Sequence, residues 1–528
     1  MKRLLYGALA LAGLVWTGSA DAQLAPTPPT KTITIYNNSV QRTLYPVIQA
    51  PIQLGANVHD LWLQAQLGIK EADYLTRPFQ TTKLYRIWIN HDTGGIPPGG
   101  SVTVTVPFYT QLRPWTQANA GKLNDQFVDW WNAMRVYIFD GKDEADAAYN
   151  FSQDNPPAGV PVQPVLPPYP VTPLAGAVAP ACSTGCTLDL RSYYVGFPYG
   201  VLGQLVEYTF ASAEGPPNAK TFAIQLGQVN YNISAVDSIY LPAAIGAKGN
   251  NSGANTWLGS SLPVATFRAA LGDFASKGAL WPDFIPAYYL PSNSIIAIPS
   301  PNGPPSGISA YPLPQVASAN LMYAESFSEP APAPPTLTSD ADPPWVNKAV
   351  YGELGSVGQG TLDLWNNCTT AAAPGKTCNQ IRSIKSFFVA DYKECFGRAP
   401  DLTDPNVLHQ FLREVYGWAQ FPGCSDSLAK VLPDQYPVAI QTFCDLMYNF
   451  FSVTNDADVF NPYVKLVHVM LASNAYAFSI DDEQAFKSIP GTGVIITVGG
   501  VKGLENKTQS PLPTAQTYTT FCQSGAKR

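Results

Sequence analysis

The sequence predicts a mainly β protein interrupted by a helical insertion that disulfides staple. Of 528 residues, 49 are Pro and 41 are Gly, while only 13% are charged and 12% are aromatic. This composition is typical of loop-rich exported β proteins. Short segments with alternating polar and apolar residues recur between turns, and helical spacing replaces this alternation from 345 to 473. That helical region holds five of the eight cysteines.

The first 22 residues have the pattern of a secretory signal peptide. A basic start, Met1-Lys2-Arg3, precedes an apolar run over 4–16 and an A-x-A site at Ala20-Asp21-Ala22. We therefore expect cleavage near Ala22 and a secreted or periplasmic protein. No cysteine follows the cut, and no later run reaches the roughly 18 uncharged apolar residues of a membrane span. A membrane anchor is not expected.

Residues 23–344 form the first part of the expected β domain. Lys31 to Tyr36 alternates cleanly before the turn at Asn37-Asn38, and Ser101 to Pro107 is the plainest alternating segment. Two Pro-rich connectors, 155–181 and 300–344, carry little strand pattern. The strands expected in this part lie at 31–36, 44–50, 61–67, 84–90, 101–107, 134–139, 188–194, 205–210 and 294–299, with one more, of unspecified bounds, within 230–242.

Residues 345–473 are expected to form the helical insertion, with the chain returning to the β domain over 474–528. Apolar residues recur at i, i+3 and i+4 in four segments of the insertion, which predicts four helices. Strand patterns then resume at 475–480 and 493–498. The expected helices lie at 379–396, 404–421, 437–451 and 462–473.

Eight cysteines in an exported chain predict disulfides rather than a metal site. Spacing leaves 105 possible pairings, among which Cys182 with Cys186 and Cys368 with Cys378 are the local choices. Zinc would require paired C-x-x-C spacing or histidines nearby, and the four histidines are scattered. We therefore expect neither a metal nor another cofactor. The net charge of −7 argues against nucleic acid and anionic membranes as partners.

The stretch from 205 to 242 contains two acids in strand-like surroundings. Val206, Tyr208 and Phe210 share one face of the first segment, so Glu207 and Thr209 point the other way. In the second segment, Asp237 shares parity with apolar neighbours. Either a bulge re-aims Asp237 or the side chain is partly buried. Both alternatives distinguish it from an ordinary surface acid.

Carboxylates are the groups in this chain that could carry catalysis. No G-x-S-x-G elbow, P-loop or G-x-G-x-x-G is present, which leaves esterases and nucleotide enzymes unsupported. Glycosidic hydrolysis needs one protonated and one ionised carboxyl on opposite sides of the bond. Asp481-Asp482 and the isolated Arg135 complete the candidate set. By spacing alone these are ordinary residues, and the pattern favours solvated strand-end acids and a salt-bridged arginine over a catalytic set.

Five motifs in order resemble the signature of the thaumatin fold. The strongest is the Glu207-Tyr208-Thr209-Phe210 strand, followed by I-S-A-V-D ending at Asp237 and the pair Leu241-Pro242. Four further segments are similar to the family's other strands: 34–38 (TIYNN), 98–102 (PGGSV), 135–137 (RVY) and 476–482 (YAFSIDD).

This resemblance implies a thaumatin-like β-sandwich or barrel, closest to bacterial β-1,3-glucanases of glycoside hydrolase family sixty-four. It implies a monomeric, inverting enzyme that acts on β-glucan or another polysaccharide. Glu207 would be the general acid and Asp237 the general base. The cleft between the β domain and the helical insertion would bind substrate through Arg135, Thr209 and Asp481-Asp482.

The chain departs from the family in two ways. Many thaumatin-like proteins have an acid where this chain has Asn232, and the family's cysteine framework is missing. A less negative cleft leaves open a second interpretation, that of a non-catalytic glycan-binding or defence-type protein. Binding needs the groove but not the chemistry.

Overall fold

A computed structural model describes the β domain and few positions outside it. The ranges described are 24–50, 84–115, 126–150, 168–183, 185–193, 203–214, 223–235, 238–249, 256–277, 288–289, 295–299 and 487–504, with the single or short positions 197, 389, 398–401, 403, 467, 470–471 and 475. The four expected helices of the insertion, and the strands expected at 61–67 and 475–480, lie outside the described residues apart from isolated positions.

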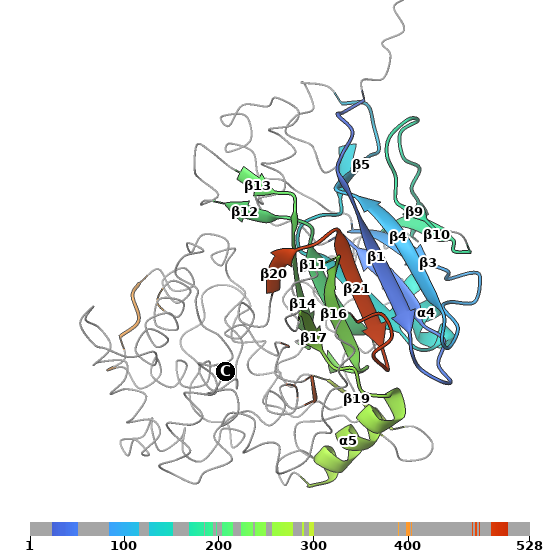
Figure 1. Cartoon of the computed structure of the whole chain (residues 1–528), viewed down its shortest axis with the longest axis vertical. Helices are drawn as coiled ribbons and strands as arrows, with labels where there is room; N and C mark the ends of the chain where they lie inside the picture. Colours follow the sequence, from blue (N-terminus) through green and yellow to red (C-terminus); the bar gives the residue numbers. More distant parts are fainter. Residues whose placement is uncertain are drawn as a thin grey trace, which may run out of the picture.

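The mainly β class is confirmed, since strands dominate the described chain (Figure 1). Two sheets of six and eight strands carry most of them. The six-stranded sheet has the order β17-β16-β21-β1-β4-β9, with β1 at Thr30–Asn37, β4 at Ser101–Pro107, β9 at Ala181–Cys182, β16 at Ala243–Lys248, β17 at Trp257–Gly259 and β21 at Gly493–Val498. Its first and last strands along the chain are parallel neighbours, because Ile33 pairs with Val494 and Ile35 with Ile496.

The eight-stranded sheet carries the residues on which the functional argument rests. Its order is β20-β14-β11-β7-β2-β3-β10-β8, with β2 at Tyr45–Gln49, β3 at Leu84–Ile89, β7 at Met134–Phe139, β8 at Tyr169–Pro170, β10 at Leu188–Tyr193, β11 at Gln204–Thr209, β14 at Gln228–Ser234 and β20 at Lys487–Pro490. The remaining strands are β5 at Tyr109–Gln111, β6 at Phe127–Asp129, β12 at Ser212–Glu214, β13 at Ala223–Gln225, β15 at Ser238–Ile239, β18 at Tyr288–Tyr289 and β19 at Ile295–Pro299.

A core of alternating apolar side chains lies between the two sheets. Ile33 and Ile35 of β1 are fully buried, as are Val206 of β11 and Ile233 of β14. Strands β11 and β14 contact β16 of the other sheet, so the inner faces pack against each other. Period-two alternation explains why the predicted strands match their observed positions: each buries one face here.

The outer face of the eight-stranded sheet carries a second, aromatic core. Helix α4, Lys142–Tyr149, packs there with Ala145, Ala148 and Tyr149 buried. Trp88 is fully buried at the centre of this cluster, and its indole N–H donates to the Tyr193 hydroxyl over 2.7 Å. The other described helix, α5 at Val264–Lys277, contacts β19 (Figure 1).

The expectation that 155–181 carries little regular structure needs a small correction. Short strands β8 and β9 lie in or at the end of this range and pair with β10 and β4. Pro170 fits β8 because that strand is at the edge of its sheet, where a missing N–H is tolerated.

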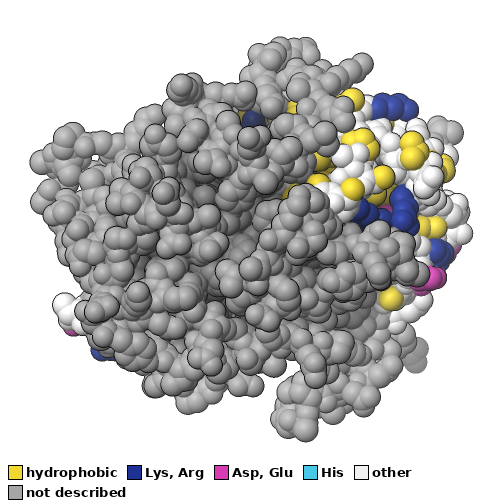
Figure 2. Space-filling model, turned by 90° about the horizontal axis from the view of Figure 1, so that it is seen from below, with side chains coloured by type: hydrophobic (Ala, Val, Ile, Leu, Met, Phe, Trp, Pro, Cys, Tyr) yellow, Lys and Arg dark blue, Asp and Glu magenta, His cyan; other side chains and the backbone are white. Residues whose placement is uncertain are grey.

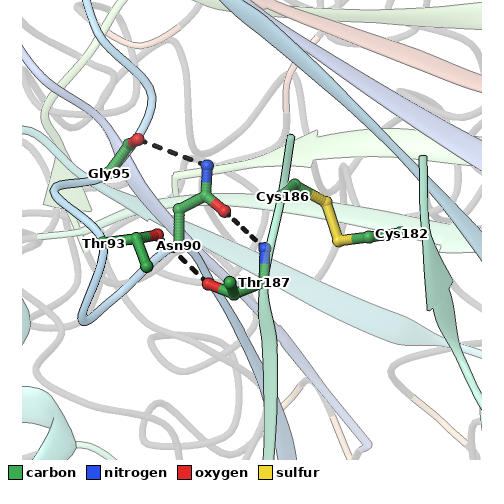
Figure 3. The surroundings of a disulfide bond; sticks show 6 residues. All are labelled: Asn90, Thr93, Gly95, Cys182, Cys186 and Thr187. Atoms are coloured by element: carbon green, nitrogen blue, oxygen red, sulfur yellow. Dashed lines mark hydrogen bonds between the residues drawn. A yellow bond between two sulfur atoms is a disulfide. The ribbon is translucent and has the colours of Figure 1, made fainter. Parts of the chain in front are cut away.

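The predicted disulfide between Cys182 and Cys186 is present. It lies beside the turn after β3, where the Asn90 side chain accepts from the Thr187 N–H over 2.8 Å and donates to the Gly95 carbonyl (Figure 3). Asn90 has φ +53°, a left-handed conformation that asparagine tolerates better than most residues. The other predicted pair, Cys368 with Cys378, lies outside the described residues.

We expect Cys182→Ser/Cys186→Ser to lower the free energy of unfolding by about 2 kcal/mol. A bridge stabilises chiefly by restricting the unfolded chain, and a loop this short yields a value at the lower end of the usual range. Urea unfolding of the double variant and the wild type checks the figure. An unchanged midpoint would show that the turn at 90–96 is held by its hydrogen bonds alone.

Lys31 ties the two sheets together and makes stability depend on pH. Its ammonium donates to the carbonyls of Gln228 and Gly491 over 2.6 and 2.9 Å. Burial lowers the pKa of Lys31 from 10.5 to about 8. Between these values the unfolded chain holds the proton that the folded chain has lost, so stability should rise with pH. The shift sets an upper limit of roughly 3 kcal/mol, which solvent screening of the partly exposed ammonium reduces.

The rise from pH 8 to pH 10 should be smaller in Lys31→Met, and the part that remains should come from Lys487, whose pKa is also lowered by burial. Above pH 10 the opposite slope should take over, because burial raises the pKa of Tyr109 and Tyr193 to about 12 and folding then opposes their ionisation. Urea midpoints measured at half-unit steps from pH 7 to 11 check both. A Lys31→Met curve parallel to that of the wild type would contradict the assignment.

Candidate functional site

The sequence-predicted pair Glu207 and Arg135 meets on the outer face of the eight-stranded sheet. Strands β11 and β7 are antiparallel neighbours, and their register places Glu207 directly opposite Arg135. The Arg135 Nε donates to Glu207 Oε1 over 3.1 Å. Glu207 is 14% exposed and Arg135 35%. The pair therefore lies at a half-buried position that solvent still reaches.

The orientation of Glu207 follows from strand parity. Val206, Tyr208 and Phe210 are buried in the core between the sheets, with exposures of 1% or less. Glu207 and Thr209 must then face outward, as predicted. The Thr209 hydroxyl accepts from the Ala133 N–H over 2.9 Å, and so it also holds the backbone just before β7.

The register extends this pair into a row of polar side chains across the sheet. Asn232 of β14 lies opposite Glu207 on its other side, and Gln49 of β2 lies opposite Arg135. Gln49 in turn lies opposite Arg86 of β3. Directly opposed residues of antiparallel strands share a face, so all five side chains lie on the outer face.

One end of this row is buried and positively charged. Arg86 is fully buried, and its Nε donates to Gln49 Oε1 over 2.7 Å. Its guanidinium lies 4.1 Å from the Tyr193 ring centroid and 3.7 Å from that of Phe197. Burial lowers the pKa of Arg86 to about 10, which leaves it charged at neutral pH. The amide and the aromatic faces stabilise this charge.

Three predicted site residues cannot be placed. Asp237, Asp481 and Asp482 lie outside the described residues. Asp237 follows β14, which ends at Ser234, and precedes β15. The separation of the Glu207 and Asp237 carboxyls therefore stays a prediction.

Asp140, an acid that follows Arg135 at the end of β7, has a structural role. Asp140 is buried, and its Oδ2 accepts from Arg268 Nη2 of α5 over 2.8 Å. The Tyr240 hydroxyl donates to its other oxygen. These contacts tie the end of β7 to α5, so Asp140 holds the scaffold together.

Three tryptophans whose flat rings could in principle stack on sugars belong to the core instead. Trp130, Trp131 and Trp257 are 0, 1 and 6% exposed.

A further polar cluster lies at the far edge of the same face. The His91 ring stacks on Tyr149 at 4.0 Å, and its Nε2 lies 3.0 Å from Asp146 of α4. That nitrogen makes no hydrogen bond despite this proximity. Tyr149 donates to Asp189 over 2.6 Å, and burial raises the Tyr149 pKa well above its usual range. These contacts dock α4 on the sheet.

The described residues include neither a metal cluster nor a membrane span. No group of three or more His, Cys, Asp or Glu side chains gathers among them in a way that could hold an ion. Within the same ranges, no helix has the length and apolar character to cross a bilayer. On the described part of the face in Figure 2, basic, acidic and apolar side chains are mixed.

Sequence reasoning placed Asn232 in the cleft through the resemblance but missed Gln49, Gln228 and Asn230 as polar neighbours on the same face. Polar residues alternate with apolar ones in 228–234, QVNYNIS, which shows that they share a face. Their position next to Glu207 depends on the register between β11 and β14. The alternation in 228–234 could be seen in the sequence, but its pairing with β11 could not.

Comparison with known proteins shows distant structural similarity only. Neither a protein-family model nor a curated protein matches the chain. A crystal structure of a laminaripentaose-producing β-1,3-glucanase in complex with laminaritetraose is 11% identical, with a TM-score of 0.33 over 90% of this chain and 99% of the other. A β-1,3-glucanase domain (GH64) from Clostridium beijerinckii is 13% identical, with a TM-score of 0.31 over 90% and 100%.

Proposed function

We propose that this protein is an exported glycoside hydrolase that acts on β-1,3-glucan, with Glu207 as one of its two catalytic carboxyls. The observation that supports this proposal most strongly is the position of Glu207 on the outer face of the eight-stranded sheet. It is half-buried there, beside Arg135 and opposite the Asn232 amide. A reactive carboxyl needs this combination of restricted exposure, a charged neighbour and a rigid scaffold.

In the proposed inverting scheme, Glu207 protonates the leaving oxygen while Asp237 activates water from the opposite side. Inverting enzymes place their two carboxyls roughly 6.5–9.5 Å apart to leave room for that water. The helical insertion would supply the second wall of the cleft, and Asp481 and Asp482 would contribute to substrate binding. The thaumatin-like fold and monomeric state are part of the same proposal.

The ion pair sets a requirement on this scheme. Arg135 at 3.1 Å interacts favourably with ionised Glu207, whereas a general acid must carry a proton. Substrate must therefore draw Arg135 toward its own hydroxyls, or desolvate the pair, before Glu207 can donate. Arg135 would then bind substrate and also control the charge of the acid.

The same ion pair favours a second candidate, glycan binding without hydrolysis. A Glu207 that stays paired with Arg135 would line a groove but would not transfer a proton. The protein would then retain carbohydrate and release no product.

Incubation of the purified protein with soluble and particulate β-1,3-glucan tests the proposal. We expect new reducing ends from β-1,3-glucan and far fewer from a β-1,4-glucan of similar length. Retention on the particulate glucan without release of reducing ends would select the second candidate. Absence of both binding and release would reject the two together.

A further inference from the structure

The outer face of β14 carries a row of three carboxamides that the proposed catalysis does not use. Gln228, Asn230 and Asn232 alternate with core residues and therefore share one face. Asn232 lies opposite Glu207, and Asn230 lies opposite Thr209. The row therefore begins beside the candidate acid and runs along β14 into the part of that strand that pairs with β20.

Each of these amides has an unused acceptor. Gln228 Oε1, Asn230 Oδ1 and Asn232 Oδ1 are shielded from solvent and accept no hydrogen bond in the structure. A shielded acceptor without a partner costs about 1–3 kcal/mol. Three such acceptors at two-residue spacing on one strand would therefore lower the stability of the fold considerably if these amides served only for packing.

A carboxamide can present either of its two polar groups to a ligand. Its terminal torsion is broad, so a small rotation presents either the oxygen or the NH₂ group. One amide can therefore accept from one hydroxyl and donate to the next. Adjacent hydroxyls on a sugar ring offer both functions.

Among the described residues, the three amides of β14 and their register neighbours carry no net charge. The charges of Glu207 and Arg135 cancel, and Thr209 and Ser488, which lie opposite Asn230 on either side, are neutral. Lys487 belongs to the other face, because its register partner Tyr231 is buried in the core. An uncharged surface of this kind favours an uncharged ligand, since a carboxylate or sulfate would lose its hydration without gaining a partner.

We propose that Gln228, Asn230 and Asn232 form a binding subsite for a neutral, polyhydroxylated chain that extends from Glu207 along β14. This inference rests on the proposed function and specifies its substrate class. Four residues of strand span about 13 Å, which accommodates an oligosaccharide rather than one sugar. The three amides would determine specificity for uncharged over acidic glycans.

Binding and kinetics of amide-deleted variants test the subsite. Asn230→Leu and Gln228→Met nearly conserve side-chain volume, and each should raise the Kd or KM for long neutral β-1,3-glucan about tenfold. The kcat should change less than about threefold, because binding common to ground and transition states is lost. The matched control is Asn38→Leu, an amide at the end of β1 in the other sheet that donates to the Lys502 carbonyl. It should match the wild type.

A second arm tests charge selectivity. Wild-type protein should bind neutral β-1,3-glucan at least about tenfold more tightly than its carboxymethylated derivative of equal length. Equal binding of the two glucans would overturn the specificity claim.

The outcomes separate this inference from the proposed function. An active wild type with unaffected Asn230→Leu and Gln228→Met would overturn the subsite and leave the hydrolase standing. Weakened binding in these variants, with no hydrolysis by the wild type, would support the subsite and remove the enzyme. Failure of the wild type to bind any neutral glucan would overturn both.

Discussion

Glu207→Gln is expected to lower the hydrolysis of β-1,3-glucan by about 100-fold to 10,000-fold while leaving the fold intact. Gln is nearly isosteric with Glu but has no acidic proton, and general acid catalysis contributes a factor of this size. Release of reducing ends measures the loss. Circular dichroism and the urea midpoint should change little, because a half-exposed ion pair contributes at most about 1 kcal/mol.

The leaving group of the substrate distinguishes acid catalysis from a structural role. When the leaving group is the phenolate of a strongly acidic phenol, it departs from an aryl glucan without protonation. Glu207→Gln should therefore retain much more activity on that substrate than on glucan. Asp143→Asn, at an exposed acid in the first turn of α4, is the matched control and should behave as wild type. An equal loss on both substrates would assign Glu207 to binding or positioning instead.

Trp88→Ala is expected to destabilise the protein by about 4 kcal/mol. Trp88 is fully buried, and its ring contacts Phe139, Tyr149 and Phe197. Truncation leaves a large cavity, and the Tyr193 hydroxyl also loses its donor. Large-to-small substitutions of buried aromatic residues typically cost about 3–5 kcal/mol, and the expected loss for Trp88→Ala lies in this range. Chemical unfolding monitored by fluorescence and by circular dichroism measures it.

Trp88→Phe separates the contributions of volume and hydrogen bonding. It keeps most of the ring contacts and removes the indole N–H, so we expect a loss of about 1–2 kcal/mol. A cost below about 1 kcal/mol for Trp88→Ala would contradict the packing of α4 on this face. That result would also weaken the inference that aromatic rings stabilise the buried charge of Arg86, because its guanidinium lies over the neighbouring rings of Tyr193 and Phe197.

Some elements had only a weak local signal in the sequence. Strand β16 consists of AAIGAK, which has low intrinsic β propensity, and it forms because β21 and β17 pair with it on both sides. Helix α4 has two acids in its first turn, but it has eight residues and begins after Gly141, which makes no side-chain capping bond. In both cases tertiary contacts supply the stability that local preference does not.

The sequence by itself determined the β class, the positions of the alternating strands, the Cys182–Cys186 bridge and the outward orientation of Glu207. These are local properties, because strand parity and a four-residue separation involve only near neighbours. The resemblance also placed Arg135 in the same site as Glu207, but it could not show that the two form an ion pair.

Only the tertiary structure decided which outward residues are neighbours. Arg135 and Glu207 are 72 positions apart, and Glu207 meets Asn232 only through the register of β11 and β14. A slip of one residue would turn every side chain of a strand to the opposite face. Register is set by pairing across the whole sheet, and so the row from Asn232 to Arg86 exists only once the sheet has formed.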